Sequence, residues 1–164
     1  MNVCAEQIGV RNAFGDKTQT AAANDFESAI ARIESAVVDA CDRSADWPAR
    51  ITAGIGAALH FMIANPAAAR ALAIDSRSGG TGQDGDYAEM IARFAALLGA
   101  GAPRSDRLPA SNDRSVVSVI AAIVSCHVRA GTVDSLDKGD PDLVFLALLP
   151  YLGFAEASRW SAGL

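Results

Sequence analysis

Aromatic residues are scarce in this chain, since Phe, Trp and Tyr make up only 6% of its 164 residues. The hydrophobic share is nevertheless 51%, so it is mostly aliphatic, and alanine dominates many stretches. Alanine is the strongest helix former because its side chain loses no conformational entropy in a helix. A chain of this length is near the size of one domain with one substantial core. The composition therefore predicts an all-α fold, a helical bundle.

Positive charge is also in deficit. Lys and Arg number 14 against 19 Asp and Glu, which gives a net charge of −5. A nucleic-acid-binding domain normally carries a basic patch that neutralises phosphates. The start of the chain is neutral, with Glu6 and Asp16 against Arg11 and Lys17. The charge pattern predicts no basic surface for DNA.

The cysteines Cys4, Cys41 and Cys126 are widely spaced and form no C-x-x-C motif. Such spacing is typical of reduced thiols in a cytosolic protein. The N-terminal residues lack the charged and apolar segments of a signal peptide. The longest apolar run, Leu143 to Leu149, is too short to span a bilayer. The sequence predicts a cytoplasmic protein that does not enter a membrane.

Catalytic and metal-binding motifs are absent as well. The chain contains no H-E-x-x-H, no G-x-S-x-G and no cluster of metal ligands. Gly79 to Gly82 lacks the G-K-[ST] ending of a phosphate-binding loop, which favours a plain loop. Cys126 and His127 are adjacent, so on a helix they point about 100° apart and cannot form a dyad. The sequence predicts no catalytic residues, no cofactor and no metal.

Apolar residues recur at spacings of three and four along most of the chain, the pattern of helices with one buried face. Pro48, Pro66 and Pro141 lie at expected helix starts, because proline fits a first helical turn. We predict helices over residues Thr18–Ser44, Trp47–Ala64, Pro66 to about Asp75, Tyr87–Leu98, Ser115–Ala130 and Pro141–Leu149.

Two of these segments need a further argument. Ser115–Ala130 is rich in Val and Ile and has the composition of a strand, but its length without a turn signal and Gly131 as a stop favour a helix. Pro150 is expected to bend or end the helix that begins at Pro141, and Ala155–Trp160 to form a short last helix. No strand is expected.

Three motifs make the chain resemble the TetR family of transcriptional repressors. The segment A-E-Q-I-G-V at 5–10, followed by F-G-D-K at 14–17, is similar to the second helix of the family's helix-turn-helix and the start of its linker helix. The segment D-W-P-A-R-I at 46–51, with N-P-A at 65–67, is similar to the family's central helix and the break after it. The segment L-L-P-Y-L-G at 148–153 looks like the end of its C-terminal dimerisation helix.

The resemblance implies that residues 18–164 form an effector-binding and dimerisation domain and that residues 1–17 are the remnant of a helix-turn-helix. Only three residues separate Val10 from Phe14, where the family has a turn and a recognition helix. Three residues make less than one helical turn and cannot present side chains to a major groove. We therefore expect the ligand-sensing and homodimerisation core of a TetR-like transcriptional regulator that does not read DNA as written.

By the resemblance, an apolar small-molecule effector would lie among the first four predicted helices. Gly54 and Gly56 would leave space for it, and His60 could be a polar anchor, although a core or partly exposed histidine is the commoner case. The same apolar stripes are also typical of plain core. The candidate ligand-binding residues are Phe26, Ile30, Ile55, Leu59, His60, Met62, Met90, Phe94 and Ile123.

Homodimerisation is expected through the helices Ser115–Ala130 and Leu143–Leu152. The first carries a stripe of small residues that would let another helix approach closely, and the second is apolar on every face. A monomer would expose an apolar patch, which soluble proteins avoid. The candidate interface residues are Ser118, Ala122, Ser125, Phe145, Leu146, Leu149 and Leu152.

Two other functions fit the same sequence. One is a stand-alone helical interaction module that heterodimerises with a full-length repressor. The other is an enzyme on a helical scaffold, which is disfavoured because no acid, base or nucleophile is assembled. A cavity among the central helices would favour the ligand sensor over the interaction module.

Overall fold

The computed structural model describes residues 25–44, 46–75, 83–103, 112–136 and 141–163. Within these residues the regular structure is entirely helical, which confirms the predicted all-α class. After a helix over residues 25–41 come the elements α2 (Trp47–Ala64), α3 (Pro66–Arg70), η1 (Ala71–Asp75), α5 (Gln83–Gly99), α6 (Asn112–Ala130), η2 (Val133–Leu136) and α7 (Pro141–Ala162).

Most helix bounds follow the sequence pattern. The helix α2 has the predicted bounds, and α3 and η1 together cover the short segment predicted after Pro66. The segment Ser115–Ala130 is helical as expected, although α6 begins earlier, at Asn112. The helix α5 also begins earlier than predicted, at Gln83. The motifs at 5–10 and 14–17, the glycine-rich stretch 79–82 and Cys4 lie outside the described residues.

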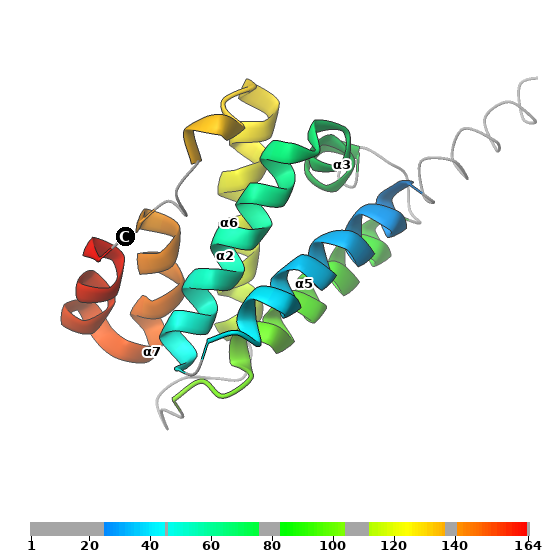
Figure 1. The fold of residues 1–164 in the computed structure, drawn as a ribbon. Helices are drawn as coiled ribbons and strands as arrows, with labels where there is room; N and C mark the ends of the chain where they lie inside the picture. Colours follow the sequence, from blue (N-terminus) through cyan, green and yellow to red (C-terminus); the bar gives the residue numbers. More distant parts are fainter. Residues whose placement is uncertain (1–24, 45, 76–82, 104–111, 137–140, 164) are drawn as a thin grey trace, which may run out of the picture.

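The helices pack as a bundle with α2 running through its middle (Figure 1). Helix 25–41 lies alongside α5 on one side, and α7 packs against α2 and α6 on the other. The helices α5 and α6 are in extensive contact with each other. Both α2 and α6 therefore face the interior with more than one side.

Two clusters of buried side chains make the core. The larger joins helix 25–41, α2, α5 and α6, with Leu59 and Met62 among its members. The smaller joins Trp47 and Ile51 of α2 to the inner face of α7. Half-buried side chains that pack against both clusters connect them: Ile55, Val117 and Ile120.

One end of the bundle is fastened by polar contacts of two aromatic residues. The buried indole of Trp47 donates a 2.8 Å hydrogen bond to the carbonyl of Leu98. The ring of Tyr151 lies 4.9 Å from that of Trp47, and its hydroxyl donates to the carboxylate of Asp113. Burial, and then the hydrogen bond to Asp113, raise the pKa of Tyr151, so the hydroxyl remains a donor. These contacts join the starts of α2 and α6 to the end of α5 and the middle of α7.

The helix α7 is broken near its middle, as Pro150 predicts. Gly153 has φ +75° and ψ 172°, outside the helical region, so the chain turns there and continues as a second helical segment to Ala162. Phe154 follows the break and packs edge-on against Phe145, with ring centroids 5.6 Å apart. The expected short last helix is confirmed.

No single helix among the described residues is long and apolar enough to cross a membrane. Only α2 taken together with Pro66–Ala73 reaches that length and apolarity, and the two parts are bent by 109° at the break between them.

Two glycines in helices, Gly99 and Gly56, provide a matched test of the packing around Asp113 and Tyr151. A methyl group on Gly99 would overlap the Asp113 carboxylate, whereas one on Gly56 would meet nothing within 4 Å. Gly99→Ala should lower the free energy of unfolding by about 1–3 kcal/mol, since Asp113 must move away from Tyr151. Gly56→Ala should raise it by up to about 1 kcal/mol through helix propensity. Urea denaturation measures both, and equal stabilisation by the two variants would refute this packing.

Candidate ligand-binding cavity

A cavity of about 170 Å³ lies inside the bundle. Its walls come from helix 25–41, α2, η1, α5 and α6, with one residue from α7. The lining residues are Ile33, Val37, Cys41, Ile51, Gly54, Ile55, Met62, Leu72, Ala73, Tyr87, Met90, Ile91, Phe94, Leu97, Leu98, Val117, Ile120, Ala121, Val124, Ser125 and Ala147.

The space exists because short side chains face it. Ala121 and Ser125 lie one turn apart on α6, and Ala73 and Ala147 face the cavity from η1 and α7. Protein interiors are otherwise close-packed, so short residues on several facing elements leave a void that the long side chains of α5 do not fill.

Gly54 lines the cavity and also lies at a close contact between two helices. A methyl group at this position would lie 3.1 Å from the Cys41 sulfur and 3.4 Å from Val37, so the glycine allows α2 and helix 25–41 to approach closely. Gly56 does not line the cavity. The prediction that Gly56 provides space for the cavity is therefore wrong, whereas Gly54 borders the cavity and also allows the close helix contact.

The polar groups of the lining are few, and two of them are already paired within the chain. The Ser125 hydroxyl donates a 2.7 Å hydrogen bond to the carbonyl of Ala121. The Cys41 thiol donates to the carbonyl of Arg50 at 3.4 Å. An apolar cavity of about 150 Å³ stays dry and binds benzene, so a cavity of this kind fits one apolar ring. Recognition there would rest on shape and on the transfer of apolar surface out of water.

Burial sets the chemistry of the Cys41 thiol. Desolvation raises its pKa above the ordinary value, and the charge of Arg50 offsets part of that increase. The protonated thiol is a poor nucleophile, so Cys41 acts as a small hydrophobic residue.

The structure brings part of the predicted ligand-binding set together. Ile55, Met62, Met90 and Phe94 line the cavity. Phe26 and Ile30 do not, and instead line a neighbouring groove.

Leu59, His60 and Ile123 are corrections to the predicted site. Leu59 is only 2% exposed and belongs to the packed core rather than to the cavity wall. His60 is exposed to solvent, so it cannot be a polar anchor inside the cavity. Ile123 packs against the core but does not reach the cavity.

Several lining residues of α6 were missed because, apart from Ile123, the candidate residues of this helix were assigned to the interface. Val117, Ile120, Ala121 and Val124 follow the i, i+3, i+4, i+7 pattern of one helix face, and all of them line the cavity. This signal was present in the sequence. Ile33 and Val37 were missed in the same way, since they continue the stripe of Phe26 and Ile30.

The predicted interface residues differ in burial, and Phe145, Leu149 and Leu152 pack against the smaller core cluster. Ser118 is exposed, and Ala122, Phe145, Leu146, Leu149 and Leu152 are half-buried. Ser125 is a correction, because it is 3% exposed and faces the cavity, so it is not available to a second subunit. Two apolar residues missed by the sequence argument are the most exposed: Val119 at 50% and Phe154 at 73%.

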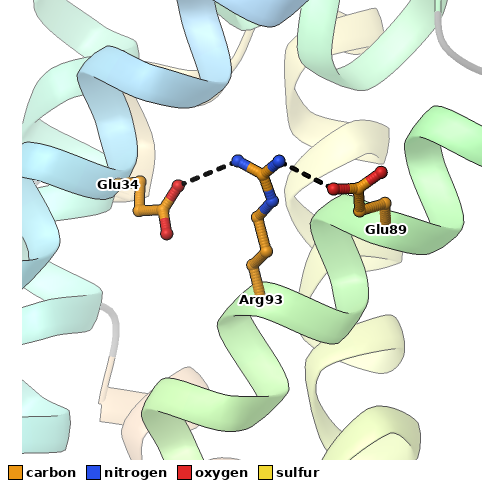
Figure 2. A network of polar contacts seen from close by, with 3 residues as sticks. All are labelled: Glu34, Glu89 and Arg93. Carbon is orange, nitrogen blue, oxygen red and sulfur yellow. Dashed lines mark hydrogen bonds and ion pairs between the residues drawn. The ribbon is translucent and has the colours of Figure 1, made fainter.

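A second hollow lies beside the cavity, between helix 25–41 and the first half of α5. It has a volume of about 160 Å³, and Met90 lines both spaces. Arg93 lies at this hollow and bridges the two helices (Figure 2). Its guanidinium is 2.7 Å from Glu89 on its own helix and 3.4 Å from Glu34 on helix 25–41. The hydrogen bond to Glu89, and then that to Glu34, raise the pKa of Arg93.

No group of His, Cys, Asp or Glu in the part of the chain that the structure describes is arranged to hold a metal ion. No family model matches the sequence, and no curated protein or solved structure matches it either.

The two described thiols should differ sharply in reactivity. In a Cys4→Ser background, Ellman's reagent should modify the exposed Cys126 quickly and Cys41 at least about a hundredfold more slowly, since Cys41 reacts only after local opening of the fold.

The stability of the protein should also depend on the protonation of Cys41. Because the pKa of Cys41 is raised in the folded state, the contribution of this residue to the free energy of unfolding is lost as pH rises above the unfolded value of about 8.5. Equal labelling rates, or a stability that does not fall there relative to Cys41→Ala, would contradict this assignment.

Proposed function

We propose that this chain is a ligand-sensing and homodimerising helical domain of the TetR type, the effector-responsive part of a transcriptional regulator. The observation that carries the proposal is the apolar cavity of about 170 Å³ formed by helix 25–41, α2, η1, α5 and α6. All of these elements except α6 belong to the segments among which the sequence resemblance expects an apolar effector.

The apolar lining supports a ligand-binding role. Aliphatic and aromatic side chains surround a space of about 170 Å³ that the chain itself does not fill. Because apolar surface gains free energy when it leaves water, an apolar ligand that fills this space would stabilise the folded state.

The outer surface supports a self-association role. Val119 on α6 and Phe154 on α7 are exposed, and three further apolar residues of α7, Phe145, Leu146 and Leu149, are half-buried. Where such residues form one contiguous patch, they are typical of a protein interface. A second copy of the chain would cover them through a symmetric contact.

The helix α6 links the two proposed activities. One of its faces lines the cavity through Val117, Ile120 and Val124, and Val119, on the opposite side, is exposed. A ligand that moves α6 would therefore change the surface offered to the partner subunit. Such differential contact in two states is what a ligand needs to shift a conformational equilibrium.

Filling the cavity tests the sensor proposal. Toluene and indole should raise the melting temperature of the protein, by the equivalent of about 2.7 kcal/mol at a hundredfold excess over the dissociation constant. Ala121→Leu places extra carbons in the cavity and should abolish this shift, whereas Ala130→Leu, at an exposed position of the same helix, should preserve it. Differential scanning fluorimetry measures both. A shift that persists in Ala121→Leu would place the ligand elsewhere and remove the basis of the proposal.

A charge on α7 tests the dimer. Leu146 is half-buried and belongs to neither core cluster among the described residues. Leu146→Glu should convert a dimer to a monomer, because a carboxylate is costly to bury in an apolar interface. Ala67→Glu, at an exposed position of α3, is the control and should remain dimeric. Light scattering at micromolar concentration measures the molecular mass of each variant. A wild-type protein that is monomeric under these conditions would contradict the proposed dimer.

A further inference from the structure

The hollow beside the cavity differs from it in chemistry. We call it the acidic groove, and its lining residues are Phe26, Glu27, Ile30, Ala31, Asp86, Glu89, Met90 and Arg93. Four of its lining residues are apolar (Phe26, Ile30, Ala31 and Met90), and the other four are charged. Met90 belongs to the walls of both spaces, so this one flexible side chain lies between them.

Negative charge prevails around the groove. Glu27, Asp86 and Glu89 line it, and Glu34 reaches it through its ion pair with Arg93, the one cation in the lining. The Arg93 guanidinium lies between Glu34 and Glu89, which come from different helices (Figure 2). Two carboxylates are thus already arranged around a positively charged group next to an apolar cavity.

We infer that the ligand of this site is a cationic amphiphile: an apolar ring in the cavity, joined by a short chain past Met90 to an ammonium group between Glu34 and Glu89. This inference rests on the proposed function and adds the charge of the ligand to it. The ligand's ammonium takes the place of the Arg93 guanidinium, whose side chain is 48% exposed and can extend into solvent.

The exchange of the guanidinium for the ammonium is nearly neutral at these two partly exposed carboxylates, so releasing Arg93 costs little. The net charge of the groove favours the added cation, because Glu27, Glu34, Asp86 and Glu89 outnumber Arg93. The ammonium group of a ligand whose ring is already bound is held near the carboxylates at a high effective concentration. An anionic ligand would instead meet the surrounding carboxylates, and both guanidinium contacts of Arg93 are already used.

Three compounds with one apolar body separate the alternatives: 4-phenylbutylamine, 4-phenylbutan-1-ol and 4-phenylbutyrate. Calorimetric titration at pH 7 and low salt should show the amine binding about five- to tenfold more tightly than the alcohol, and the carboxylate most weakly. The advantage of the amine should shrink at about 0.5 M salt, since these charges are partly exposed.

Variants locate the cation. Glu89→Gln and Glu34→Gln should each reduce amine binding about threefold or more and leave alcohol binding unchanged, which also reports that the protein is folded. Arg93→Gln should strengthen amine binding, because it removes the competing guanidinium. Glu156→Gln is the matched control, since Glu156 also pairs with an arginine, Arg159, but on α7.

The outcomes distinguish this inference from the proposed function. Equal binding of the three compounds, or an amine preference that Glu89→Gln and Glu34→Gln leave intact, overturns the cationic ligand while the apolar cavity site stands. Binding of toluene without binding of the amine does the same. If neither toluene nor any of the three compounds binds, both the inference and the proposed function fail.

Discussion

The buried hydrogen bond from the Trp47 indole to the Leu98 carbonyl is the contact on which the rest of the bundle depends. Leu98 lies in the last turn of α5, where carbonyls lack a partner within the helix, and the indole supplies one. The contact holds the first residue of α2 against α5, while Tyr151 packs on the same indole from α7. Since α2 contributes to both core clusters, its placement fixes the distance between the helices that enclose the cavity.

Much of this architecture is predictable because its signals are local. Pro48, Pro66 and Pro141 mark helix starts, and the break of α7 follows from Pro150 and Gly153. The cavity is less predictable because α2 is apolar around most of its circumference. Periodicity alone then cannot tell which face meets the void, and for this reason Leu59 and His60 were assigned to the cavity wrongly.

The same ambiguity affects α6 and the glycines. Ser118 and Ser125 are seven residues apart and therefore lie on the same face of α6, yet Ser125 faces the cavity and Ser118, two turns earlier, is exposed to solvent. Helical periodicity groups them, and only the packing of neighbouring helices distinguishes them. A glycine in a helix indicates that side-chain volume is absent, but not which neighbouring group occupies the space. At Gly54 the neighbouring group is the Cys41 side chain. This contact depends on how α2 and helix 25–41 cross, which a short stretch of sequence does not reveal.

The charge arrangement at Arg93 is the feature furthest from sequence reasoning. Glu89 and Arg93 form an ordinary i,i+4 pair that a reader of the sequence would assign to a solvated face. The third member, Glu34, is 59 residues away from Arg93 and meets it only because helix 25–41 lies alongside α5. A ligand that replaces Arg93 would exchange a contact between two helices for a contact of both helices with the ligand. Binding of such a ligand would therefore alter the packing of helix 25–41 as well as that of α6. These two helices would transmit the effect of binding from the cavity to the rest of the domain.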